Sequence, residues 1–169
     1  RLAVDAVQAL GKLDCALGEL GADCVALSAH KLHGPKGAGA LVFAGDIAIK
    51  PLVHGGGQER GLRSGTENVA AIAGLGVAVE LAEQQRTAAH AHLTRLRARF
   101  VERLAPLAGA RVLEPGATRL PSIVAVLLPG ALAEVHLHHL EARGVFVGTT
   151  SACQAAKREL SPALRALGL

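Results

Sequence analysis

The chain has 169 residues, of which 50% are hydrophobic and 19% charged, and it carries a formal net charge of +4. This composition excludes an intrinsically disordered protein, and the length suffices for one sizeable core or parts of two smaller ones. The 3 cysteines are far apart and fit neither a disulfide framework nor a zinc-binding spacing, so we expect a cytoplasmic location. No apolar run approaches the roughly 18 residues of a membrane span, and no leader for secretion is recognisable.

Two further features of the composition concern partners and completeness. The arginines between positions 95 and 103 have no Tyr or Trp beside them, which favours a solvated helix face over nucleic-acid binding. The chain begins at Arg1 and contains no methionine, so we expect these residues to be an excerpt of a longer polypeptide.

Three short apolar runs near the N-terminus, at residues 2–6, 23–28 and 39–43, are predicted to be strands. Continuous apolar runs of this length are typical of strands that are covered on both faces. A helical turn or short helix is expected within residues 11–21, and the glycine-dense residues 54–66 are expected to form a loop.

The middle of the chain has the spacing of a long helix. Ser64-Gly65-Thr66-Glu67 has the spacing of a capping box and comes directly before the helical pattern. The pattern consists of two apolar stripes: Val69, Ile72, Leu75, Val79 and Ala82, and then Leu93, Leu96, Phe100 and Leu104. The polar run at 83–87 between them could be a hinge between two domains or one uninterrupted solvated stretch.

After Pro106 the pattern changes to short strands and helices. Residues 110–113, 122–128 and 145–147 are predicted strands, and 132–143 is a predicted helix that Gly144 ends. A short terminal helix is expected at 160–167, with Pro162 near its start. Strands therefore alternate with helices, which indicates the α/β class.

Lys31 stands out because it follows an apolar strand and precedes the tight turn Gly34-Pro35-Lys36-Gly37. We expect this lysine to be semi-buried, which favours the neutral, nucleophilic amine that forms a Schiff base with an aldehyde cofactor. The alternative is an ordinary strand-end lysine that reaches back to solvent.

The segment His30-Lys31-Leu32-His33-Gly34-Pro35-Lys36-Gly37 resembles the pyridoxal-phosphate lysine motif of class V aminotransferase-type enzymes, and of the cysteine desulfurases above all. The motif starting at Val4-Asp5-Ala6, the lysine motif, the loop at 54–66 and Ser151-Ala152-Cys153 occur in the order of that family. The resemblance implies that residues 1–86 are the C-terminal part of a large cofactor-binding domain, with a mostly parallel sheet and helices on both faces. Residues 87–169 would be part of a small α/β domain that carries the cysteine loop.

The resemblance also implies a role for each matching residue. Lys31 binds the cofactor covalently, and its catalytic partner is the sulfur-accepting Cys153. The implied cofactor ligands are Asp5 for the pyridine nitrogen, Gln8 for the ring hydroxyl, Ser28 and His30 for the phosphate, and Thr66 for the phosphate of a partner subunit in a homodimer.

Taken singly, these residues have ordinary alternatives: a strand-end cap for Asp5, a helix-start residue for Gln8 and a helix N-cap for Thr66. An inert buried thiol suits Cys15 and Cys24 better than Cys153, which stands among small polar residues.

The implied reaction converts L-cysteine to L-alanine and leaves a persulfide on Cys153. The sulfur would pass to an iron–sulfur scaffold protein or to tRNA thiolation. The family's ring-stacking histidine and its carboxylate-binding arginine have no counterpart in these residues, so we expect the isolated chain to be inactive. Thr149 and Thr150 are bulkier than the family's usual residues, which changes the expected shape of the cysteine loop.

Other functions are compatible with the same residues. A selenocysteine lyase or another class V pyridoxal-phosphate lyase would use the same lysine, and a truncated chain could serve as a non-catalytic dimerisation module. His136 and His139 are one helical turn apart, but without a third aligned ligand they favour surface histidines over a metal site. We expect no metal.

Overall fold

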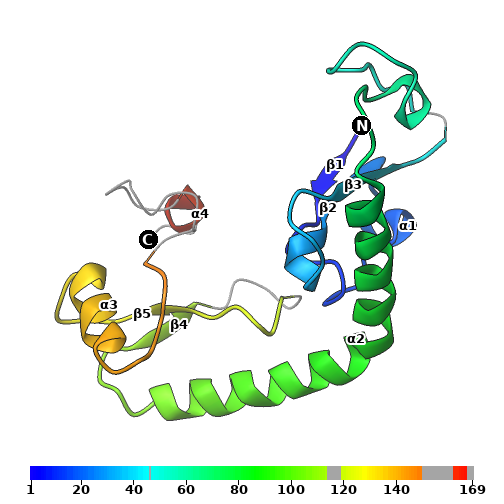
Figure 1. Cartoon of the computed structure of the whole chain (residues 1–169). Helices are drawn as coiled ribbons and strands as arrows, with labels where there is room; N and C mark the ends of the chain where they lie inside the picture. The colour runs from blue at the N-terminus through cyan, green and yellow to red at the C-terminus, as the bar shows by residue number, and fades with distance from the viewer. Residues whose placement is uncertain (46, 114–118, 150–161, 167–169) are drawn as a thin grey trace. The chain divides into compact units, whose positions relative to one another are not determined.

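The computed structural model describes residues 1–45, 47–113, 119–149 and 162–166 (Figure 1). It divides into two compact units, Arg1–Arg95 and Leu96–Leu169. The long helix α2, Val69–Leu104, runs from the first unit into the second. In the described part of the chain, no helix combines the length and the apolar character needed to cross a membrane.

The first unit contains a three-stranded sheet of β1 (Ala3–Asp5), β2 (Cys24–Ser28) and β3 (Gly39–Phe43), in the order β1-β2-β3 (Figure 1). The positions of all three strands were predicted from their apolar runs. β1 and β2 are parallel, with Asp5 paired to Ala26, whereas β2 and β3 are antiparallel. A short connection returns the chain from β2 to β3, and such a connection joins strands in antiparallel orientation.

The mostly parallel sheet expected for the first part of the chain is seen only in part, because that sheet has one parallel pairing, β1 with β2, and one antiparallel pairing, β2 with β3. The second unit has a separate antiparallel pair, β4 (Arg111–Leu113) with β5 (Ala125–Leu127). β3 is also largely exposed rather than covered on both faces. The expected combination of strands and helices in one chain is confirmed.

The first core lies against β2. Ala6, Ala22 and Val25 are buried there, and half-buried apolar side chains surround them, among them Leu17 and Leu20 of the short helix α1 (Leu17–Leu20). Gly21 ends α1 in the left-handed conformation, with φ of 57°, which glycine adopts without a clash at Cβ. The helical turn or short helix expected within residues 11–21 is therefore present as α1.

α2 is continuous from Val69 to Leu104, so the polar run at 83–87 is an uninterrupted helical stretch and not a break between helices. The alternative role of Thr66 as the helix N-cap is not what the structure shows. Asn68 precedes the first helical residue, and its Oδ1 accepts a hydrogen bond from the Ala71 N–H at 3.2 Å. Asparagine serves because its short side chain reaches the free N–H groups of the first turn.

Small residues pack α2 against the turn that follows β2. This turn is a 3-10 helix, η1 (Ala29–Leu32). A Cβ added at Gly34 would lie 3.0 Å from the Ala78 Cβ, and one added at Gly74 would lie 2.6 Å from the Pro35 Cγ. The helix and the turn therefore approach as closely as they do only because glycine and alanine line the contact.

The predicted apolar stripe of α2 is only partly the one that is buried. The buried residues are Ala71, Leu75 and Ala78, whereas Val69 is 71% and Ile72 43% exposed. Two alanines and one leucine of the helix are therefore buried, whereas two β-branched residues of the predicted stripe stay exposed.

The second unit contains the pair β4–β5, the helix α3 (Ala133–Glu141) and the helix α4 (Pro162–Ala166). As predicted, α3 ends in a turn before Gly144, whose φ is 74°. The predicted strand at 145–147 is wrong. Those residues adopt no strand conformation, and Phe146 is 81% exposed, so neither a backbone ladder nor packing holds them extended.

Candidate active site

The carboxyl ends of two parallel strands form the edge of the sheet at which the candidate site lies. Asp5 is the last residue of β1 and Ser28 the last of β2. The Ala6 N–H donates to the Ala26 carbonyl at 3.0 Å, which continues the ladder to this edge. Since β1 and β2 are neighbours, the residues that directly follow them emerge at the same edge, where α/β sheets bind their ligands.

Asp5 is exposed and held by its own turn. Its Oδ1 accepts a hydrogen bond from the Val7 N–H at 3.0 Å. This bond is the strand-end cap considered from the sequence, and it turns the chain away from the strand. The cap orients the carboxylate through a single oxygen and is compatible with a second partner.

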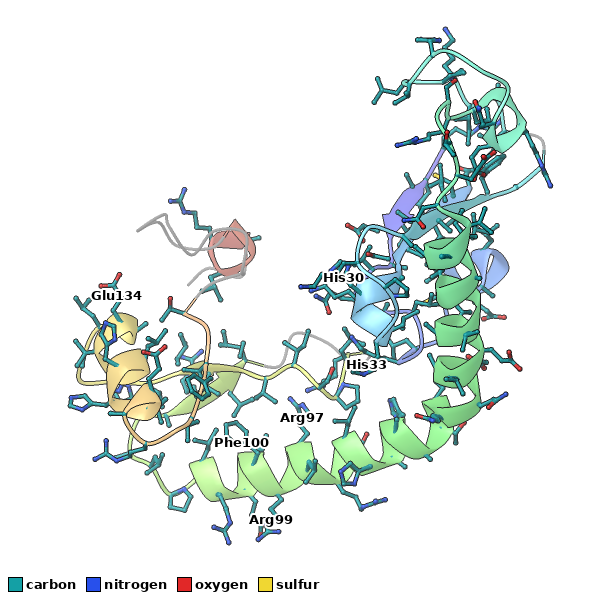
Figure 2. The ribbon with its side chains drawn as sticks, in the orientation of Figure 1. His30, His33, Arg97, Arg99, Phe100 and Glu134 are labelled. Atoms are coloured by element: carbon teal, nitrogen blue, oxygen red, sulfur yellow. The ribbon has the colours of Figure 1, made fainter. Side chains whose placement is uncertain are left out.

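Ser28 and His30 are joined at the start of η1. The Ser28 Oγ lies 2.7 Å from the His30 Nδ1, which is a short hydrogen bond between a hydroxyl and an imidazole. His30 extends from the exposed side of the turn, as Figure 2 shows. The pair places two groups that can donate hydrogen bonds directly after the carboxyl end of β2.

Lys31 lies within η1, between the buried residues Ala29 and Leu32. Ala29 is 0% and Leu32 7% exposed, whereas Lys31 itself is exposed. The expectation of a semi-buried lysine is therefore wrong for this chain. A 3-10 turn explains the difference, because its buried face is occupied by Ala29 and Leu32 and the residues between them face outward.

Gln8 has a lysine neighbour, Lys12, to which no motif in the sequence pointed. The Lys12 Nζ donates to the Gln8 carbonyl oxygen at 3.0 Å and to the Gln8 Oε1 at 3.5 Å. Burial lowers the pKa of Lys12, and repulsion from the charge of Lys31 lowers it further. The spacing of four residues between Gln8 and Lys12 was the available signal.

The glycine-dense loop before α2 is organised around a buried serine. The Ser64 Oγ donates to the Gly56 carbonyl at 2.9 Å, and the Arg63 Nη1 donates to the Ser64 carbonyl at 2.9 Å. Glu59 and Arg60, in the short turn η2 (Glu59–Gly61), have φ values of 48° and 58°, a left-handed conformation that is strained for residues other than glycine. Thr66 is exposed in this loop, just before the cap Asn68.

Cys153, the predicted sulfur acceptor, lies outside the described residues. Cys15 and Cys24 are half-buried. Burial raises the pKa of the Cys15 thiol, and the charge of Asp14 raises it further, so this thiol resists ionisation. Cys15 also lines a hollow of about 420 Å³ bounded by β2, β3 and α2, which contains none of the predicted cofactor residues.

The histidines of α3 form no metal centre in the described residues. His136 is half-buried, and the His138 Nδ1 lies 3.5 Å from the Glu141 Oε2. Among the described residues, no group of three or more metal-ligating side chains lies close together.

Residues 1–168 match the family described as aminotransferase class-V. The chain belongs to this family. Class V enzymes and their cysteine desulfurase members depend on pyridoxal phosphate.

Within class V, the chain is similar to cysteine desulfurases and NifS-like proteins. It is 40% identical to the cysteine desulfurase IscS of Clostridium botulinum over 168 residues, which cover 98% of this chain and 42% of that protein. Among solved structures, a NifS-like protein gives a TM-score of 0.80 at 39% identity, covering 93% of this chain and 43% of its own. DndA from Streptomyces lividans gives a TM-score of 0.73 at 31% identity, covering 99% and 48%. The chain thus spans less than half the length of the relatives that it matches.

Proposed function

We propose that this class V chain binds pyridoxal phosphate at the carboxyl ends of β1 and β2 and supplies the lysine and the cysteine of a cysteine desulfurase. The parallel pairing of β1 and β2 carries the proposal, because it brings the residues after both strands to one edge. The 40% identity to a cysteine desulfurase over 98% of the chain supports the choice of reaction.

The donors at this edge fit the chemistry of the cofactor. The Ser28 hydroxyl and the His30 imidazole, 2.7 Å apart, suit a phosphate, and the Lys31 amine suits an aldehyde. The Asp5 carboxylate suits a protonated pyridine nitrogen, and Gln8 suits the ring hydroxyl. Bound there, the cofactor would supply an electron sink for bond cleavage in the substrate.

The chain's own residues would then divide the work. Lys31 anchors the cofactor and, once released, its neutral amine takes up a proton from the substrate. Asp5 holds the proton of the ring nitrogen. The Cys153 thiolate accepts the sulfur of L-cysteine, so that a persulfide remains on Cys153 and L-alanine leaves as the product.

The larger assembly belongs to the same proposal. Residues 1–86 would be part of a large cofactor-binding domain and residues 87–169 part of a small one, with Thr66 serving the phosphate of a partner subunit in a homodimer. The persulfide sulfur would pass to an iron–sulfur scaffold protein or to the relay proteins of tRNA thiolation. A cytoplasmic location stays a prediction from the cysteine usage.

Borohydride trapping tests the cofactor site directly. The chain is mixed with pyridoxal phosphate, reduced, digested and analysed by mass spectrometry, and we expect the adduct on Lys31. Lys31→Ala should abolish this adduct, whereas Lys36→Ala, at an exposed lysine of the same turn, should leave it intact. An adduct spread over surface lysines, or none, would contradict the site and favour a non-catalytic module.

Turnover is a separate measurement. We expect the 169 residues alone to release no alanine or sulfide from L-cysteine, and alanine release by the isolated chain would overturn that expectation. In a longer active polypeptide, Cys153→Ala should abolish cysteine desulfuration and Cys15→Ala should preserve it. Selenocysteine turnover that survives Cys153→Ala would instead indicate a selenocysteine lyase.

A further inference from the structure

Packing beneath the turn fixes the position of Lys12, a residue to which the proposed function gives no role. The preceding Gly11 has φ of 71°, and a Cβ added there would lie 2.8 Å from the Ala82 Cβ and 2.9 Å from the Leu32 Cδ2. Leu32 is the buried neighbour of Lys31 in η1. The backbone before Lys12 is therefore pressed against the same turn that carries Lys31.

The Lys12 ammonium also makes two contacts with Gln8. It donates to the backbone oxygen at 3.0 Å and approaches the side-chain oxygen at 3.5 Å. A lysine has only donors, so this contact engages the amide oxygen of Gln8 and leaves the amide N–H groups for an acceptor elsewhere. The oxygen of a ring hydroxyl is such an acceptor.

We propose that Lys12 is a positioning residue of the cofactor site, which orients the Gln8 amide and keeps a positive charge beside the Lys31 nitrogen. The proposal rests on the proposed function, since it assigns Lys12 a task only if pyridoxal phosphate is attached to Lys31. It adds a residue to the site without adding a step to the reaction.

The charges around Lys12 set the sign of the expected effect. The titratable groups on the flanking segments are Asp14 and Cys15 on its own segment, His30, Lys31 and His33 at η1, and Glu80, Glu83 and Arg86 on α2. Among them, Lys31 is the charge that acts on the pKa of Lys12, and the action is mutual repulsion. Replacing Lys12 with a neutral residue therefore removes a repulsion against a positive charge on the Lys31 nitrogen of the loaded chain.

The test is a pH titration of the visible absorbance of the chain loaded with pyridoxal phosphate. In Lys12→Met we expect the midpoint to move to higher pH by about 0.5–1 unit, as is typical for two neighbouring charges in a partly solvated site. Lys12→Arg keeps the charge and should leave the midpoint unchanged. Lys36→Met removes a charge from the exposed part of the same turn and serves as the matched control.

Two outcomes would overturn the proposal: an unchanged midpoint in Lys12→Met, or an equal shift in Lys12→Arg, which would indicate packing and not charge. Lys12→Gln, neutral but polar, replaces the methionine variant if that variant does not fold. Failure of the wild-type chain to form the trapped Lys31 adduct would instead refute the proposed function. The two failures are therefore distinguishable.

Discussion

The two halves of α2 differ in the burial of their side chains. In residues 69–82, Ala71, Leu75 and Ala78 are buried, and glycine and alanine allow the helix to approach the turn after η1 closely. Residues 87–104 are all described, and none of them is buried, although Leu96 and Phe100 are large and apolar and stand 49% and 47% exposed. Burial along this helix therefore depends on a fitting surface opposite each side chain and not on hydrophobicity alone.

The largest expected effect comes from shortening one leucine in each half. Leu75 is 8% exposed, so Leu75→Ala should lower the free energy of unfolding by about 2–4 kcal/mol through lost burial and a cavity. Leu96→Ala, at a side chain that is half exposed, should lower it by less than about 1 kcal/mol. Urea denaturation followed by circular dichroism measures both, and equal losses would contradict the contrast between the halves.

A smaller effect is expected from two glycines within the packed half. A Cβ at Gly76 would meet nothing within 4 Å, so Gly76→Ala should stabilise the helix by about 0.5–1 kcal/mol. A Cβ at Gly74 would lie 2.6 Å from the rigid ring of Pro35, and overpacking costs about 1–3 kcal/mol. Gly74→Ala should therefore be destabilising overall. Stabilisation by both variants in thermal unfolding would show that the helix and the turn are not tightly packed.

The smallest effect is expected at the junction between the halves, where Arg86 donates to both carboxylate oxygens of Glu83 at 2.8 and 2.9 Å. The hydrogen bond from Arg86 lowers the pKa of Glu83 in the folded chain. A carboxyl with a lowered pKa stabilises the fold above its unfolded pKa, and this contribution is lost as the pH falls through the folded pKa.

The small loss caused by Glu83→Gln should accordingly be present at neutral pH, absent in acid and weakened by salt. Urea denaturation of Glu83→Gln, Arg86→Gln and the double variant across pH measures the coupling. A loss that persists below the titration range would exclude the ion pair as its cause.

Local signals predicted much of the fold. The apolar runs placed β2 and β3, and Gly144 marked the end of α3. These features depend on propensities and turn residues that act within a few positions. The same reasoning placed Lys31 directly after a strand, where the structure has it.

Features that depend on tertiary contacts were not predictable in the same way. Thr66 and Asn68 are both good caps, and only the actual start of the helix selects Asn68. The exposure of Lys31 follows from the burial of Ala29 and Leu32, which depends on packing between parts of the chain that are distant in sequence. Lys12 is an ordinary lysine until the turn that carries Lys31 is packed beside it. Cys153 lies outside the described residues and stays a prediction.

η1 is held by the buried side chains of Ala29 and Leu32. The side chains before and after the pair His30-Lys31 are anchored in the interior, while the lysine extends a flexible four-carbon arm from a fixed origin. An amine on such an arm can be released from a bound molecule and attach to it again with no rearrangement of the main chain. Movement of the amine toward and away from such a molecule would then need only rotation about side-chain bonds, which takes about picoseconds to nanoseconds, and no slower loop motion.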